Sequence, residues 1–155
     1  MTTINVLKLD HLGNPTNHPY AYYPCIRLRY SFQASFAEPN GRRGLNGIVT
    51  ALAMIDTGAD LNLIKSDLIP SSASPVETVT NYGVNGATQE RNYEVTFHLP
   101  EFDAFHQTGI ISWSPGNNPP YDVILGRKFL QMCRFEFDQH EGIQNLTYSN
   151  NPHAI

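Results

Sequence analysis

Hydrophobic and polar residues alternate over several short stretches of this chain. In residues 26–32 (IRLRYSF) and 93–99 (YEVTFHL) every second residue is apolar. A period of two is the pattern of a β-strand that buries one face. Residues 76–80 and 93–99 flank a turn at 83–86, so the pattern predicts a long hairpin with a glycine-flanked tip.

Shorter apolar runs indicate the remaining elements. Further strands are predicted at residues 48–55, 61–64, 109–113 and 123–125, a short helix at 127–132, and a closing hairpin from 134–138 and 142–148. Loops are predicted from composition at residues 37–46, 70–75 and 114–120. No helical pattern exceeds about two turns. The chain is therefore predicted to be mainly β.

Length and composition support this fold class. The 155 residues fit one domain, and charged residues make up only 15%, well below the usual share. With 11 Gly, 11 Pro and 11% aromatic residues, the composition favours a β-rich globular fold over a helical bundle or a disordered chain. The net charge is -4 and the only basic cluster is Arg42–Arg43, which argues against a nucleic-acid binder.

The chain divides into three parts by composition. Residues 1–23 are polar and turn-rich and predict an arm or an extra edge segment, residues 24–148 form the domain, and residues 149–155 form a C-terminal tail. The first residues lack the basic and apolar stretches of a signal peptide, and no run approaches the length of a membrane span. We therefore expect a cytoplasmic protein without a membrane partner. The six histidines and two cysteines show no metal-ligand spacing, so neither a metal nor another cofactor is expected.

The most informative segment is AMIDTGAD, residues 53–60. Asp56 directly follows a buried apolar run, and a carboxylate at the end of a core strand must be solvated, paired or tuned. Thr57 adds a hydroxyl that can bond to backbone, and Gly58 removes side-chain bulk where another backbone approaches. A turn-forming role for Asp56 is the structural alternative. A second motif, VILGR at residues 123–127, ends an apolar strand in a glycine before the short helix.

In order and spacing, the segment AMIDTGAD, the tip around YGVNG and the ILGR sequence resemble the motifs of the retropepsin-type aspartic proteases, the single-domain, dimeric relatives of pepsin. The resemblance covers residues 24–148. It implies a single-lobe acid-protease fold, which is a closed β-barrel with a flap hairpin and one short helix after the ILGR motif. It also implies a homodimer that acts on a peptide or protein substrate.

The resemblance implies a role for each motif residue. Asp56 matches the catalytic aspartate, Thr57 the residue whose hydroxyl braces the two active-site loops across the dimer axis, and Gly58 a position whose carbonyl accepts from the substrate backbone. Asp60 and Arg127 match a pair that links the active-site loop to the helix. Active-site support is expected from Thr57, Gly58, Ala59, Asp60, Gly126 and Arg127, and substrate binding from Gly58, Ala59, Asp60, Gly83, Val84, Asn85, Gly86 and Ile124.

These roles predict an aspartic endopeptidase in which one Asp56 from each of two chains activates a water. Two carboxylates about 3 Å apart cannot both ionise, so the pair holds one proton. Ala59 stands where pepsin-like enzymes carry a hydroxyl residue that favours the ionised form, so activity is expected to extend toward mildly acidic or near-neutral pH. The alternative is a module of the same fold that dimerises or binds extended peptides with little or no proteolysis.

Overall fold

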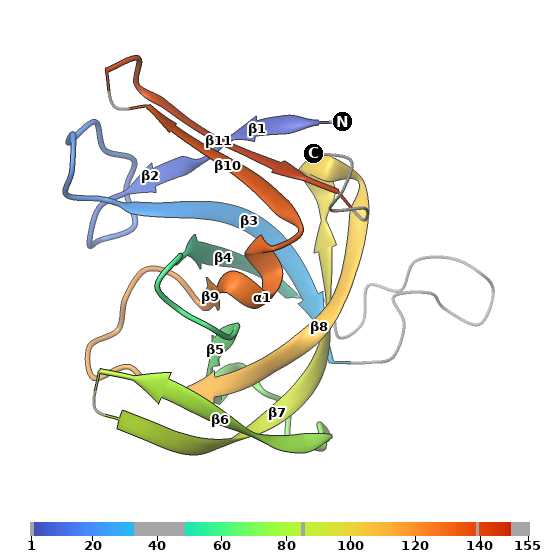
Figure 1. Ribbon diagram of the computed structural model, residues 1–155. Helices are drawn as coiled ribbons and strands as arrows, with labels where there is room; N and C mark the ends of the chain where they lie inside the picture. The colour runs from blue at the N-terminus through green and yellow to red at the C-terminus, as the bar shows by residue number, and fades with distance from the viewer. Residues whose placement is uncertain (1, 33–48, 85, 139, 150–155) are drawn as a thin grey trace.

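The computed structural model describes residues 2–32, 49–84, 86–138 and 140–149 (Figure 1). The predicted loop at 37–46, Asn85 of the hairpin tip and the end of the predicted tail lie outside these residues. Within the described ranges, no helix is long and apolar enough to cross a membrane.

Short strands make up most of the described chain. In chain order they are β1 (Thr3–Asn5), β2 (Leu7–Leu9), β3 (Tyr23–Ser31), β4 (Val49–Ile55), β5 (Leu63–Lys65), β6 (Glu77–Gly83), β7 (Gly86–Leu99), β8 (Ala104–Trp113), β9 (Val123–Leu125), β10 (Cys133–Asp138) and β11 (Ile143–Tyr148). The helical elements are the 3₁₀ turns η1 (Ser66–Leu68) and η2 (Pro100–Phe102) and the helix α1 (Arg127–Leu130).

The larger of two sheets curls back on itself. Its strands follow the order β2-β3-β4-β9-β5-β8-β7-β6, and β3 also pairs with β7 from Arg29↔His98 to Ser31↔Thr96. This extra pairing makes a ring of hydrogen-bonded neighbours from β3 through β4, β9, β5 and β8 to β7, which is the arrangement of a barrel. The predicted mainly β fold, with a long hairpin and one short helix after the ILGR motif, is confirmed.

The inside of this ring holds the main hydrophobic core. Leu28 of β3, Phe97 of β7, Leu125 of β9 and Phe129 of α1 are completely buried there. Burying a side chain of this size is worth about 1.5–3 kcal/mol. A four-residue helix has no stability of its own, so the burial of Phe129 holds α1 in place and fixes the backbone just before it.

The three strands β1, β11 and β10 form a separate antiparallel sheet, in which β10 and β11 are the predicted closing hairpin. Residues 1–23, predicted as an arm or an extra edge segment, contribute β1 to this sheet. They also contribute β2 to the edge of the larger sheet, where β2 pairs with β3 from Leu7↔Cys25 to Leu9↔Tyr23.

The strand predicted at 109–113 is longer in the structure. β8 begins at Ala104 and pairs antiparallel with β7 from Asn92↔Ile111 to Leu99↔Ala104. The connection is η2 followed by Asp103, whose φ is +49°. Residues 104–108 (AFHQT) show no strict alternation, and a left-handed turn at a residue other than glycine carries little signal in sequence. Pairing with the neighbouring strand β7 extends this strand.

Candidate functional site

Asp56 lies at the end of β4, beside the end of β9. The two strands are parallel neighbours, with Ile55 opposite Leu125. The Asp56 N–H donates to the Leu125 carbonyl oxygen at 3.0 Å. Because parallel strands end at the same edge of a sheet, the two sequence motifs meet there although 70 residues separate Asp56 from Gly126 (126 − 56 = 70).

The turn after β4 holds the Asp56 carboxylate. Its Oδ1 accepts from the Gly58 N–H at 2.9 Å, and the Ala59 N–H donates to the Asp56 carbonyl oxygen at 3.2 Å. A Cβ at residue 58 would lie 3.2 Å from the same Oδ1, so a side chain there would crowd the carboxylate. Asp56 itself is half-buried and Thr57 is exposed. The carboxylate is therefore fixed on one side and open on the other.

The loop from Ala59 to Leu61 is bound to the start of α1. The Arg127 N–H donates to the Ala59 carbonyl oxygen at 2.8 Å, and the Arg127 guanidinium forms an ion pair with the Asp60 carboxylate. Glycine is required at position 126 because the Leu61 backbone approaches it closely. A Cβ at this position would lie 2.3 Å from the Leu61 carbonyl oxygen. The predicted pair of Asp60 and Arg127 is thus in contact.

Asn62 is a part of this site that sequence reasoning missed. Its side chain is wholly buried, and its Oδ1 accepts from the Gly126 N–H at 3.1 Å. Its Nδ2 donates to Thr108 Oγ1 and to the Gly109 carbonyl oxygen, each at 3.3 Å. Asn62 therefore ties the second motif to β8. The available signal was one amide residue inside the apolar run 61–64.

An apolar wall lies next to the Asp56 turn. It is a cluster of buried side chains, with partly buried ones packed around them, that contains Leu7, Leu9, Tyr23, Cys25, Leu52, Met54, Ala59, Leu63, Trp113, Tyr121 and Ile124. The rings of Tyr121 and Trp113 stack with their centres 5.7 Å apart. Burial raises the pKa of Tyr121, and the negative charge of the nearby Asp56 contributes to the rise. The predicted pocket residue Ile124 is thus part of an aromatic wall near Asp56.

Lys65 anchors the loop that leads to Tyr121. Its Nζ donates to Asn118 Oδ1 at 2.9 Å and to the Pro119 carbonyl oxygen at 3.0 Å, and it forms an ion pair with Asp122 at 3.4 Å. The side chain of Lys65 is largely buried. A loop of prolines and asparagines is held in one position by this contact.

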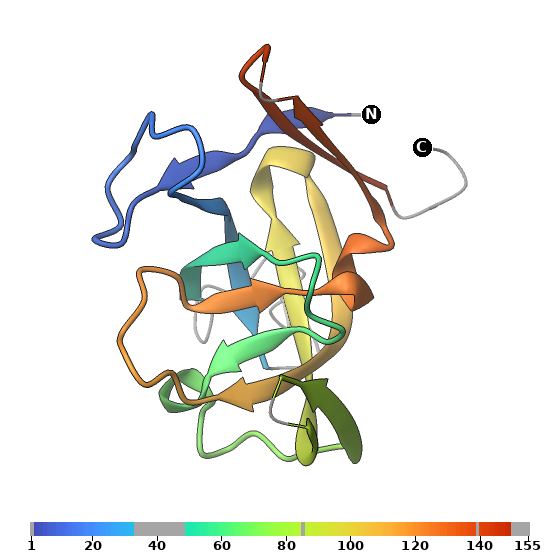
Figure 2. The same cartoon turned by 60° about the vertical axis from the view of Figure 1, so that its left-hand side comes forward.

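The hairpin of β6 and β7 projects from the ring on the side away from the three-stranded sheet (Figure 2). Gly83 pairs with Gly86 at its tip, and Gly86 has a φ of +102°, which favours glycine. Tyr82 and Val84 are exposed there. Within the described part of the chain, no backbone hydrogen bond joins this tip to the Asp56 turn.

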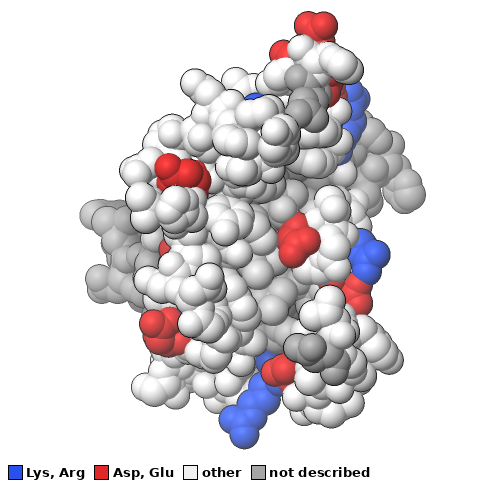
Figure 3. Space-filling view, turned by 90° about the vertical axis from the view of Figure 1, so that its left-hand side faces the viewer, with Lys and Arg blue, Asp and Glu red and all other residues white. Residues whose placement is uncertain are grey.

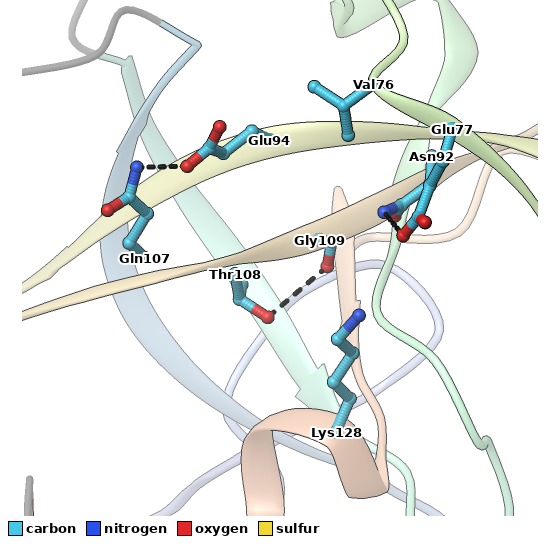
Figure 4. A pocket seen from close by; sticks show the side chains of 8 residues that line it. All are labelled: Val76, Glu77, Asn92, Glu94, Gln107, Thr108, Gly109 and Lys128. Atoms are coloured by element: carbon cyan, nitrogen blue, oxygen red, sulfur yellow. Dashed lines mark hydrogen bonds between the residues drawn. The ribbon is translucent and has the colours of Figure 1, made fainter.

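A polar pocket of about 360 Å³ lies at the base of this hairpin, beside α1 (Figure 4). Asn92 Nδ2 donates to Glu77 Oε1 at 3.1 Å, Gln107 donates to Glu94, and the Lys128 side chain points inward. None of the residues predicted to form the site lines this pocket. In the described residues, no group of three or more His, Cys, Asp or Glu side chains is arranged to hold a metal ion.

Comparison with known proteins connects this geometry to a family. The family model for the retroviral aspartyl protease matches residues 23–138, well over half of the chain. No curated protein sequence matches this chain. Among solved structures, the protease of simian foamy virus is similar at 15% identity and a TM-score of 0.41, over 68% of this chain and 91% of the viral one. A protein of unknown function from Legionella pneumophila is similar at 12% identity and a TM-score of 0.39, over 66% of this chain and 81% of that one.

Proposed function

This chain belongs to the retroviral aspartyl protease family, and from that premise we propose that it is a homodimeric aspartic endopeptidase with one Asp56 from each subunit. The observation that carries the proposal is the fixed carboxylate of Asp56. Its Oδ1 is bound by the Gly58 N–H, while the residue stays half-exposed at the end of β4. If Asp56 only formed a turn, it would not require the surrounding contacts of Gly126, Asn62 and Arg127.

The second carboxylate of the proposed pair comes from a second copy of the chain. Asp60 is the next acidic residue along the sequence, and its carboxylate is engaged by Arg127. Two Asp56 turns facing each other across a two-fold axis would supply two equivalent carboxylates. Thr57, which is exposed beside Asp56, would meet its counterpart at the same axis.

The chemistry follows from the proximity of two carboxylates. A pair about 3 Å apart holds one proton, so that one member is ionised and the other protonated. The ionised carboxylate takes a proton from a water molecule, whose oxygen attacks the scissile carbonyl carbon. The protonated carboxyl donates to the carbonyl oxygen, and a proton then passes to the leaving amine as the C–N bond breaks. The two groups titrate as one pair.

The substrate of this reaction is proposed to be an extended peptide. An extended peptide can bond through its backbone to a hairpin on one side and to the Gly58 carbonyl on the other. Ile124 and the aromatic rings next to it form an apolar wall, and the exposed Val84 and Tyr82 offer apolar cover from the hairpin tip. We therefore expect hydrophobic residues on both sides of the cleaved bond.

The test is cleavage of a mixed peptide library at several pH values by the wild-type protein and by Asp56→Asn, which keeps the shape of the side chain. Cleavage products should appear with the wild type alone, and sedimentation should show dimers for both proteins. Equal cleavage by both would identify a contaminating protease. An absence of cleavage by wild-type dimers would refute the enzyme and leave a dimerising or peptide-binding module of the same fold.

A further inference from the structure

A segment that precedes the family match packs against the wall of the candidate site. The match begins at residue 23, yet β2 adds Leu7 and Leu9 to the apolar cluster that contains Tyr121 and Ile124. In Figure 1 the segment between β2 and β3, the loop before β9 and the hairpin tip lie on the left-hand side, toward which the arrow of β4 points. The side of the molecule seen in Figure 3 is mostly uncharged, with single acidic and basic groups scattered over it. This segment therefore borders the face on which Asp56 opens.

The turn that follows β2 is rigid and touches the loop before β9. The Asp10 N–H donates to the Asn14 carbonyl oxygen at 2.8 Å, and Asp10 Oδ1 accepts from the N–H groups of Leu12 and Asn14 at 2.9 and 3.0 Å. Gly13 has a φ of +84°, and a Cβ there would lie 3.2 Å from Pro120 Cβ. The hydrogen bond from Asn14, above all, lowers the pKa of Asp10, so this carboxylate stays ionised at mildly acidic pH.

A pocket of about 310 Å³ lies between this turn and the start of β3. It is lined by Asp10, His11, Tyr20, Ala21, Tyr22 and Tyr23. Contacts outside the pocket hold its rings in place. The Tyr22 hydroxyl accepts from Gln144 Nε2 at 2.6 Å, and the Tyr20 ring meets the His18 ring edge-on at 4.9 Å between centres. One hydrogen bond and one ring contact thus position two of the rings that line the pocket.

Tyr23 connects this pocket to the candidate active site. Its ring meets the Tyr121 ring edge-on, with the centres 5.2 Å apart. Tyr121 in turn belongs to the same apolar cluster as Ala59, which lies in the turn that holds Asp56. A peptide that extends along this wall from the Asp56 turn would pass Tyr121 and Tyr23 before it reaches the pocket.

We propose that this pocket is a distal subsite of the peptide cleft that binds a lysine or arginine side chain of the substrate. The inference rests on the proposed endopeptidase function. Phenol rings attract a cation through their faces, and the Asp10 carboxylate can supply a charge-assisted hydrogen bond. The Tyr22 ring is already engaged by the protein's own Lys8, whose Nζ lies 5.4 Å from the ring centre. Tyr20 and Tyr23 are therefore the rings left to attract the substrate cation. The net charge of -4 adds a field that attracts basic peptides.

Binding of fluorescent peptides to the cleavage-deficient Asp56→Asn protein tests this inference without depending on turnover. Each peptide has an apolar pair at its centre and a single Arg, Gln, Phe or Glu moved through the outer positions. At one or more positions, the Arg peptide should bind about five- to tenfold more tightly than its Gln counterpart. Further variants on the Asp56→Asn background are Asp10→Asn, which keeps an oxygen for the turn, and Tyr20→Ala, which alters a side chain that is 80% exposed.

The preference for Arg should disappear in both variants, and the matched control Glu101→Gln, an exposed carboxylate in η2, should retain it. Equal affinity for all four peptides, or an Arg preference that survives both variants, would overturn the inference. So would a preference for Phe, which would identify an aromatic-binding pocket. If the wild-type protein cleaves peptides but shows no Arg preference, the subsite alone is refuted. If it neither cleaves nor binds any peptide, the proposed function fails with it.

Discussion

Asn62 Oδ1 accepts a hydrogen bond from the Gly126 N–H at 3.1 Å, in the interior beside the Asp56 turn. This bond is one of several contacts that join the two halves of the sequence signature, because Asn62 follows the Asp56 segment and Gly126 belongs to the ILGR segment. The amide satisfies a buried backbone donor and binds β8 with its Nδ2. The geometry around Asp56 therefore depends on a wholly buried residue outside both motifs.

Replacing Asn62 with Ala should lower the free energy of unfolding by about 2–3 kcal/mol, because the Gly126 N–H loses its partner in the interior. Thr108→Val removes only the hydroxyl that Asn62 Nδ2 reaches and should cost about 1 kcal/mol. Urea unfolding followed by circular dichroism measures both values. Equal losses for the two variants would show that the Gly126 contact is unimportant.

Gly126→Ala should destabilise the protein far more than the addition of one methyl group usually does. The added Cβ would lie 2.3 Å from the Leu61 carbonyl oxygen, so the loop and α1 must separate. We expect a loss of about 3 kcal/mol in unfolding free energy, together with loss of any Asp56-dependent activity. Gly116→Ala is the matched control, since no atom lies within 4 Å of its added Cβ. That variant should stay within about 0.5 kcal/mol of the wild type.

The buried His106 should make the protein less stable in mild acid. Burial lowers the pKa of His106, whose ring contacts those of Phe129 and Tyr148. The unfolded chain binds a proton at this residue near pH 6.5 and the folded chain only at lower pH. The free energy of unfolding therefore falls as pH drops below about 6.5, and this contribution levels off below the folded pKa.

Urea titrations at neutral and mildly acidic pH measure this slope, and His106→Gln should reduce it. Tyr148→Phe removes the hydroxyl 3.0 Å from His106 Nδ1 but keeps the ring buried, so the slope should remain. A slope that is unchanged in His106→Gln would assign the acid sensitivity to another group.

Ala59 should help to determine the lowest pH at which the proposed enzyme is active. Alanine offers no hydroxyl to the Asp56 carboxylate pair, which favours the protonated form and shifts the working range upward in pH. In Ala59→Ser, a new hydrogen bond to the ionised carboxylate should move the acidic limb of the pH–rate profile to lower pH. A wild-type profile confined below about pH 3 would contradict this reasoning.

Local patterns in the sequence predicted much of this protein. Alternation in residues 26–32 and 93–99 indicates strands because each side chain of a strand points opposite to the one before it. The resemblance of AMIDTGAD and ILGR to family motifs placed Asp56, Gly126 and Arg127 in one site. The structure brings these three residues together, and the catalytic role of Asp56 stays a prediction.

Other features were decided only by tertiary structure. In the sequence, Asn62 is only one amide within an apolar run, and its role is seen from its bonds to Gly109 and Gly126. The extension of β8 to Ala104 depends on its pairing with β7. Likewise, residues 1–23 are polar and turn-rich by composition, yet Gly13 meets Pro120 and Tyr23 meets Tyr121. The hydrophobic periodicity of the sequence carries information only about residues that are close along the chain. Contacts between distant segments depend on how the strands close into a ring, and this packing determines what lies beside Asp56.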